Sequence, residues 1–227
     1  MRRTRSRSIN YLDDYLEGLV PSSPATVFLN AWHLEVQRLN KLQSRIAGRQ
    51  GVVIWQYAPG YMNPEAGGPA AIEQMTGIKV GADQGISGSI GRKMLKNIKF
   101  GGGYLPDPRI VINDPSAVPL GTYLTDSAIS AAMRMRDSVR HILIADSNWS
   151  PELLSALFKA VRIPRISSAP AVVQASKSAL YLYGTREGAI DVTAPAGRAF
   201  ADGSQTTTIT LKLNESRLLP LVAGGAE

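Results

Sequence analysis

Three candidates for a functional site, Asn30, Tyr57 and Asp146, each stand directly after a largely apolar run of residues. Short apolar runs of this kind are typical of buried strands. When such strands are parallel, their carboxyl ends meet at one edge of the sheet, and ligands of open α/β sheets bind at that edge. The sequence therefore predicts a ligand-binding crevice that includes these three residues.

The turn after the second of these runs adds further ligand-binding candidates. Pro59 and Gly60 predict a tight turn, and Tyr57 and Tyr61 flank it. A tyrosine ring combines an apolar face, which can stack on a sugar, with a hydroxyl that can form hydrogen bonds. The alternative interpretation is that these residues serve only as turn and cap residues. The sequence leaves both interpretations open.

A hydrolytic site at the same edge is a second hypothesis. It would use Ser87 or Ser89 as the nucleophile, His33 as the base, and Asp146 or Asp114 as the acid. No motif requires this arrangement, because the segment around Ser87 departs from the G-x-S-x-G pattern in its last position. This glycine-rich segment is otherwise typical of a loop.

Several classes of site are excluded or disfavoured by what the sequence lacks. There is no cysteine, which excludes thiol nucleophiles and Cys-ligated metals. His33 and His141 are the only histidines, so we expect no metal site, and His141 opens an apolar strand where a structural role is expected. Asp13 and Asp14 diverge by about 100° on a helix, which disfavours a glycosidase carboxylate pair. No phosphate-binding or dinucleotide-binding glycine motif occurs, so we expect no cofactor.

The charge distribution argues against nucleic acid and membrane partners. The net charge is +7, and Arg2, Arg3, Arg5 and Arg7 account for more than half of it. We expect residues 1–8 to form a solvated basic arm rather than a nucleic-acid site. No apolar run approaches the roughly 20 residues that cross a bilayer. No apolar segment follows the basic start either, so the sequence predicts a cytoplasmic protein without a signal peptide.

Helices and strands are predicted to alternate through residues 9–168. The apolar spacing predicts helices over 9–17, 33–47, 70–76, 127–136 and 151–161. It predicts strands over 26–30, 51–55, 78–80, 109–112 and 141–145. Residues 85–108 are predicted to form loops or a small hairpin insertion. This alternation predicts an α/β domain with a doubly wound, mostly parallel sheet.

The last part of the chain, residues 169–227, has a different pattern. Short β-rich segments separated by turn residues predict strands over 171–175, 179–183, 189–193, 206–213 and 217–222. The sequence therefore predicts a small antiparallel β-sandwich domain after a boundary near Ser168.

The order of several segments resembles a known family. These segments are Tyr11–Gly18, Val27–Trp32, Val53–Tyr61, Met75–Ile78, Asn113–Pro115, Leu120–Tyr123, Pro151–Ile166, Ala179–Tyr183 and Ile209–Leu213. They resemble the region that follows the catalytic barrel in large glycoside-hydrolase-like proteins, related to the β-galactosidase trimerisation domain of family-42 enzymes. The resemblance implies a flavodoxin-like fold, also similar to class I glutamine amidotransferases, followed by a terminal β-domain.

The same resemblance implies no catalytic residue at any position of this chain. The amidotransferase-like fold would use a cysteine, and the sequence has none. The family's catalytic carboxylates lie in a preceding TIM barrel of about 250 residues, for which this chain has no room. The leading hypothesis is therefore a non-catalytic accessory and oligomerisation module, a homo-oligomer that can bind carbohydrate. The alternative hypothesis is a small hydrolase acting on an ester, a lactone or a glycosidic bond.

Overall fold

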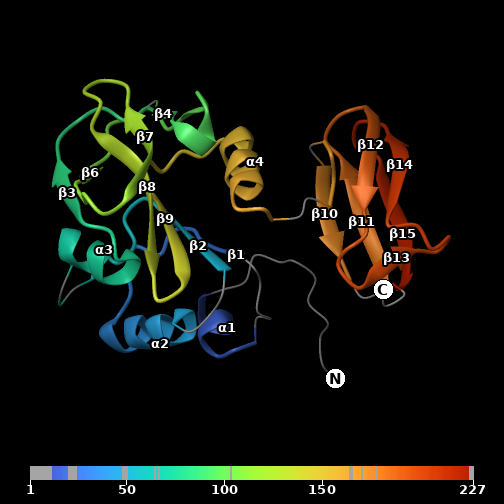
Figure 1. Cartoon of the computed structure of the whole chain (residues 1–227), viewed down its shortest axis with the longest axis horizontal. Coiled ribbons are helices and arrows are strands. Elements are labelled where there is room, and N and C mark those ends of the chain that lie inside the picture. The colour runs from blue at the N-terminus through green and yellow to red at the C-terminus, as the bar shows by residue number, and fades with distance from the viewer. Residues whose placement is uncertain are drawn as a thin grey trace. The chain divides into compact units, whose positions relative to one another are not determined.

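The computed structural model describes residues 12–19, 25–47, 51–63, 65, 67–102, 104–163, 166–169, 171–176 and 178–224. These residues form two compact units that divide after Ile163, and each unit is described here by itself (Figure 1). The basic arm predicted over residues 1–8 lies outside the described residues.

The first unit, residues 12–163, combines helices with a nine-stranded sheet in its described part. Its helices are α1 (Leu12–Leu16), α2 (Val36–Ile46), α3 (Pro69–Thr76), α4 (Pro151–Ala160) and the 3₁₀ helix η1 (Lys93–Leu95). Its strands are β1 (Ala25–Phe28), β2 (Gly51–Gln56), β3 (Val80–Asp83), β4 (Ser89–Gly91), β5 (Lys99–Phe100), β6 (Arg109–Ile112), β7 (Val118–Tyr123), β8 (Ile129–Arg136) and β9 (Val139–Ile144).

The sheet of this unit is mixed rather than mostly parallel. Strands β1, β2 and β9 pair in parallel, whereas β8, β7, β4 and β5 continue the sheet with antiparallel pairings. Strand β6 pairs with β8 and carries β3, so the sheet branches and curls (Figure 1). The structure therefore confirms an α/β fold but does not confirm a flavodoxin-like, doubly wound sheet.

The prediction of a helix over residues 127–136 is wrong, because this segment forms strand β8. Its alanines favour a helix by intrinsic propensity, but the strand pairs along its length with β9. Asp137 and Ser138, with φ of 48° and 66°, join the two strands. Two consecutive left-handed residues form the tight turn that matches the twist of a β-hairpin. The hairpin replaces the crossover that a parallel sheet would need.

Helices cover both faces of the parallel strands. On one face, Val53 and Trp55 of β2 share an apolar core with α1, α2 and α3. On the other face, Ile54 of β2 shares a second core with α4 and η1. Figure 1 shows α4 on the opposite side of the sheet from α2. Because successive residues of a strand face opposite ways, this double cover explains why the sequence of β2 is uniformly apolar.

The sequence signals at helix ends correspond to observed caps. Helix α4 begins after Ser150, whose Oγ accepts a hydrogen bond from Leu153 N, and Pro151 occupies its first turn. Helix α3 ends at Gly77, which adopts the left-handed conformation (φ 72°). No helix within the described ranges is long and apolar enough to cross a membrane.

The second unit, residues 164–227, is built from strands where it is described. They are β10 (Ala171–Ala175), β11 (Ala179–Gly184), β12 (Gly188–Thr193), β13 (Arg198–Phe200), β14 (Thr206–Leu211) and β15 (Ser216–Ala223). A four-stranded sheet, β10-β11-β15-β13, and a two-stranded sheet, β12-β14, are both antiparallel. Leu180 and Leu182 of the larger sheet share a core with Ile190 and Val192 of the smaller one.

Candidate functional site

The parallel strands bring Asn30, Tyr57 and Asp146 to the same edge of the sheet. Strands β1, β2 and β9 run in register in one direction, and each of these residues follows the carboxyl end of one of them. Asn30 and Tyr57 adopt left-handed backbone conformations, with φ of 55° and 61°, so the chain turns at once after each strand. We call the loops 29–35, 57–63, 85–88, 101–102, 104–108 and 145–149 the carboxyl edge.

Asp146 is the most highly connected polar side chain of the carboxyl edge. Its Oδ1 accepts hydrogen bonds from Ser87 Oγ (3.1 Å) and from the Tyr104 hydroxyl (3.3 Å). Its Oδ2 accepts from Gly88 N (3.0 Å) and from Ser89 Oγ (3.1 Å). The side chain is buried. Since a carboxylate has about four acceptor positions, the protein itself fills all of them.

The glycines of residues 101–102 allow the chain to approach Asp146 closely. A Cβ atom at Gly101 would lie 1.8 Å from Asp146 Oδ2, and its φ of +71° also disfavours a side chain. Gly101 N donates to Asn148 O at 2.7 Å, and Gly102 N donates to Ser87 Oγ at 2.6 Å. The hydrogen bonds of Asp146 therefore hold the glycine-rich segment against the end of β9.

This geometry does not assemble the predicted catalytic serine site. Ser87 and Ser89 donate directly to Asp146, whereas a catalytic triad would place the histidine between the serine and the acid. His33 is exposed, and among the described residues no hydrogen bond joins it to either serine or to Asp146. A nucleophile–base pair within hydrogen-bonding distance is the signature of an activated serine, and the described residues of this edge do not form one.

Asp114, the other candidate acid, lies at a different place in the sheet, after β6. Its carboxylate accepts from Ser116 Oγ (2.5 Å), from Lys79 N (3.2 Å) and from Arg134 Nη1 (2.8 Å). Burial alone would raise the pKa of Asp114, but these hydrogen bonds and the Arg134 charge lower it to about 2. Asp114 is therefore an ionised structural carboxylate that ties β8 to the loop after α3.

Three tyrosines lie together at the carboxyl edge. Tyr57 and Tyr61 are half-buried and pack on the core beneath them, and Tyr104 is 37% exposed. The Tyr57 hydroxyl donates to Pro108 O. Burial, together with the neighbouring Tyr104 and Tyr61, raises the pKa of Tyr57 to about 12, so its hydroxyl keeps its proton at neutral pH. This edge thus offers aromatic faces, which suit stacking on an uncharged polar ligand.

Pro59 and Gly60 shape the loop that carries these tyrosines. Both are buried, and Gly60 N donates to Ala31 O at 2.8 Å. Met62 N donates to Trp32 O at 2.9 Å, so the turn is fastened to the loop after β1. Pro59 and Gly60 would therefore contribute to a ligand site by positioning the neighbouring tyrosines.

The carboxyl edge also exposes apolar side chains. Leu29, Met62, Ile86 and Leu105 are all more than half exposed in its loops. Apolar side chains gathered at one edge are typical of a surface that another molecule covers. Among the described residues, no group of three or more His, Asp or Glu side chains could hold a metal ion.

Sequence reasoning missed Tyr104, which binds both Asp146 and Ser147. The available signal was its place after Gly101 and Gly102, because glycines permit the close backbone approach that brings this tyrosine to the strand end.

Comparisons with known proteins identify the fold. No family model and no curated protein matches this sequence. Among solved structures, the β-galactosidase from Bacillus circulans sp. alkalophilus superposes with a TM-score of 0.61 at 12% sequence identity, over 87% of this chain and 33% of that chain. A polyextremophilic β-galactosidase from Halorubrum lacusprofundi gives a TM-score of 0.60 at 10% identity, over 88% of this chain and 31% of that chain.

A catalytic mutant of a GH42 β-galactosidase from G. stearothermophilus gives a TM-score of 0.58 at 11% identity, over 87% of this chain and 31% of that chain. Since residues 12–163 alone make up a smaller share of the sequence than 87%, the similarity includes parts of both units. The chain spans about a third of the length of these enzymes. The chain therefore shares its fold with a portion of the β-galactosidases.

Proposed function

We propose that this chain is a non-catalytic accessory module of a glycoside-hydrolase-like protein, corresponding to the flavodoxin-like trimerisation region of β-galactosidases and the β-domain after it. The observation that carries the proposal is the fold similarity to one portion of several β-galactosidases, which extends over both units. A shared fold alone does not fix an activity, so the role of the carboxyl edge is argued from its own residues.

The hydrogen bonds of Asp146 support a non-catalytic role for this edge. A carboxylate that accepts from four internal donors must break some of those bonds before it can act on a substrate. Its function in the proposal is to hold the glycine-rich segment and Tyr104 in place. The side chains left for a ligand are then the tyrosines, which supply faces on which a saccharide can stack, because the Tyr57 and Tyr104 hydroxyls already form hydrogen bonds within the protein.

The same proposal gives the carboxyl edge a role in association. Its exposed apolar side chains would be covered by a second copy of this chain or by a catalytic chain whose carbohydrate site the tyrosines help to line. Burial of apolar surface stabilises such contacts by about 25 cal/mol per Å². Self-association is the form of this proposal that can be tested with the chain alone.

Calorimetric titration with lactose tests saccharide binding at this edge. We expect saturable binding that the substitution Tyr61→Leu weakens at least tenfold, because leucine keeps the apolar packing but removes the aromatic face and the hydroxyl. Tyr183→Leu in strand β11 of the other unit is the matched control and should leave the affinity unchanged. Equal affinity in the two variants would refute the carboxyl edge as the saccharide site.

The hydrolase alternative has its own test. The purified chain is assayed on chromogenic glycosides, esters and lactones, together with the Ser87→Ala and His33→Ala variants. The accessory-module proposal expects no turnover by any of the three proteins. Turnover that both substitutions abolish in folded protein would show a small hydrolase and overturn the proposal.

A further inference from the structure

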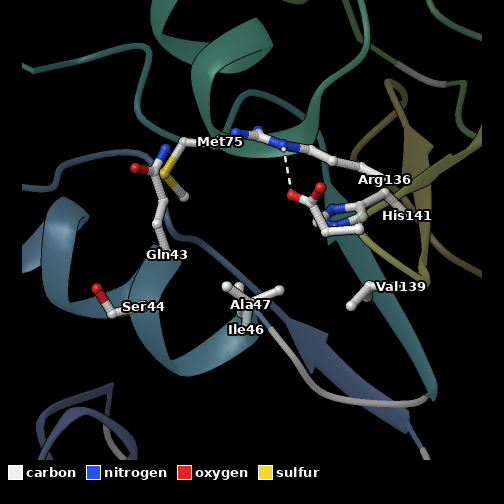
Figure 2. Close-up of a pocket in the computed structure, with 9 residues that line it drawn as sticks. Gln43, Ser44, Ile46, Ala47, Met75, Arg136, Val139 and His141 are labelled. Carbon is white, nitrogen blue, oxygen red and sulfur yellow. Dashed lines mark ion pairs between the residues drawn. The ribbon is translucent and has the colours of Figure 1, made fainter.

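A pocket of about 230 Å³ lies at the opposite edge of the sheet from Asp146. It is formed between the carboxyl end of α2, helix α3 and the β8–β9 hairpin (Figure 2). The side chains that line it include apolar Ile46, Met75 and Val139 together with polar Arg136 and His141. The strand-end residues of the carboxyl edge do not contribute to it, because His141 and Asp146 are five residues apart along β9, about 17 Å.

His141 presents an unused hydrogen-bond donor at the wall of this pocket. The side chain is only 2% exposed, and Trp55 Nε1 lies 3.1 Å from its Nδ1. An indole nitrogen can only donate, so Nδ1 must accept and the proton of the neutral imidazole must be on Nε2. Among the described residues, none accepts a hydrogen bond from Nε2. This donor lies at the wall of the pocket and is therefore available to the oxygen of a ligand.

The rings of Trp55 and His141 fix this tautomer and this orientation. Their planes are nearly parallel, with an interplanar angle of 14°. Burial, followed by the nearby Arg136 charge, lowers the pKa of His141 to about 4. The imidazole is therefore neutral at physiological pH, and it donates to the pocket without carrying a charge.

Arg136 supplies the charge of the pocket. Figure 2 shows its side chain along the same wall as His141. One guanidinium nitrogen, Nη1, donates to Gln74 O at 3.0 Å, and Nε lies 3.7 Å from an oxygen of Asp137. The Asp137 side chain is 71% exposed, so this ion pair is weak and screened by water. Asp137 also lines the pocket, so a ligand carboxylate would replace it beside the Arg136 guanidinium.

Two other polar side chains of the pocket each donate to a backbone carbonyl of the protein. Gln43 Nε2 donates to Gln74 O at 2.9 Å, and Ser44 Oγ donates to Asn40 O at 2.9 Å. The imidazole and guanidinium donors lie on the wall formed by Arg136, Asp137 and His141. The opposite walls are mainly apolar. This distribution matches a ligand with an anionic oxygen at one end and an apolar body at the other.

We propose that this pocket binds a small carboxylate with an apolar body, its oxygens accepting from His141 Nε2 and the Arg136 guanidinium. An apolar cavity of about 150 Å³ holds one benzene molecule, so a pocket of 230 Å³ accommodates a ring and a carboxylate together. Guanidinium–carboxylate hydrogen bonds are among the stronger ones in proteins, which favours a carboxylate over an alcohol of the same shape. The proposal does not depend on the function proposed for the carboxyl edge.

Benzoate is a probe of suitable size, and the indole N–H of Trp55 is a direct reporter. The protein contains three tryptophans, so the Trp55 signal in a nitrogen-resolved NMR spectrum is assigned with the Trp32→Phe and Trp149→Phe variants. Because this N–H donates to the same imidazole whose other nitrogen faces the pocket, benzoate should shift it saturably. Benzyl alcohol, which lacks the charge, should bind at least tenfold more weakly.

Three substitutions complete the test. Arg136→Gln should weaken benzoate binding at least tenfold. Ala47→Leu, at an exposed position of the pocket wall, should reduce binding to a similar extent by filling the space. Lys41→Gln, which removes an exposed cation of α2 outside the pocket lining, should change the affinity less than twofold. The proposal is overturned if the Trp55 signal does not shift, if benzyl alcohol binds as well as benzoate, or if Arg136→Gln leaves the affinity unchanged.

Discussion

Strand β9 has a buried polar side chain toward each of its ends, His141 near its start and Asp146 just beyond its last residue. Asp146 accepts hydrogen bonds from four donors of the glycine-rich segment. His141 accepts one from Trp55 and has no described acceptor for its own N–H. Both carboxylate oxygens of Asp146 accept hydrogen bonds within the protein. Only one of the two ring nitrogens of His141 forms a described hydrogen bond, and His141 borders a pocket.

This difference separates structural polar groups from groups that are available to a ligand. A satisfied buried carboxylate holds neighbouring segments in place, and its removal affects the fold before it affects any ligand. A donor at the wall of a pocket that no protein group accepts is available to an incoming oxygen. The two proposals accordingly assign ligand binding at the carboxyl edge to the tyrosines, which Asp146 helps to position, and at the opposite edge to His141 and Arg136.

The largest expected loss of stability comes from placing a side chain against Asp146. Gly101→Ala places a Cβ atom 1.8 Å from Asp146 Oδ2 and forces a side chain into a φ of +71°. We expect a loss of about 4 kcal/mol in the free energy of unfolding. Urea unfolding followed by tryptophan fluorescence measures it, since all three tryptophans, Trp32, Trp55 and Trp149, lie in the first unit.

Gly102→Ala is the matched control for that substitution. Gly102 has a φ of +90°, but the nearest atom to its added Cβ is 3.8 Å away, so only the backbone is strained. Gly102→Ala should therefore lower the free energy of unfolding by about 2 kcal/mol. If both variants lose the same stability, contact with Asp146 is not what requires glycine at position 101.

An acid-dependent loss of stability should arise at the opposite end of β9. The pKa of His141 is about 4 in the folded chain against an ordinary value of 6.5, because burial and then the Arg136 charge disfavour the imidazolium. The unfolded chain therefore takes up this proton first. The contribution of neutral His141 to the free energy of unfolding is fully present above pH 6.5. It is lost as the pH falls towards 4, which lowers the free energy of unfolding by about 3 kcal/mol.

Urea unfolding at a series of pH values measures this decrease. In the His141→Asn variant the titrating group is absent, while the Asn amide oxygen can still accept from Trp55, so the decrease between pH 6.5 and 4 should be much smaller. Asp114, with a pKa of about 2, stays ionised in the folded chain over this range. An equally steep decrease in the variant would assign the effect to groups other than His141.

A smaller effect is expected on the mass of the particle in solution. If the carboxyl edge mediates self-association, Leu105→Glu, at a side chain that is 74% exposed, should shift the chain towards the monomer in light scattering. Met135→Glu on strand β8 is the control, because Met135 is also exposed (56%) but belongs to the hairpin that borders the pocket. A change of mass with Met135→Glu alone would place the association surface away from the carboxyl edge.

Much of the edge containing Asp146 could be predicted from the sequence. The apolar runs of β2 and β9 are unambiguous, and parallel pairing then brings the residues after them together. The helix predicted over residues 127–136 was wrong because alanine-rich segments have helical propensity, and the partner that imposes a strand becomes apparent only in the fold. The turn at Asp137 and Ser138 gives only a weak signal in the sequence, since neither residue is glycine.

The roles of individual side chains were harder to predict. The hydrolase hypothesis grouped Ser87 or Ser89 with Asp146 or Asp114, and Ser87 does bond to Asp146, but the other donors around this carboxylate decide whether it holds a loop or takes part in a reaction. For His141, a structural role was expected, and its bond to Trp55 supports that expectation. Its unused donor could not be predicted, because the partner is 86 residues away in sequence and only the folded sheet shows which nitrogen that partner occupies.

The most direct test of the proposed function is a residue-resolved NMR titration of the whole chain with lactose. The account predicts saturable shifts of the backbone amides of Tyr61, Gly102 and Ser147 at the carboxyl edge, no shift of Val139 or His141 at the opposite end of β9, and no release of galactose. Shifts confined to residues outside the carboxyl edge, the absence of any shift, or hydrolysis of the lactose would contradict it.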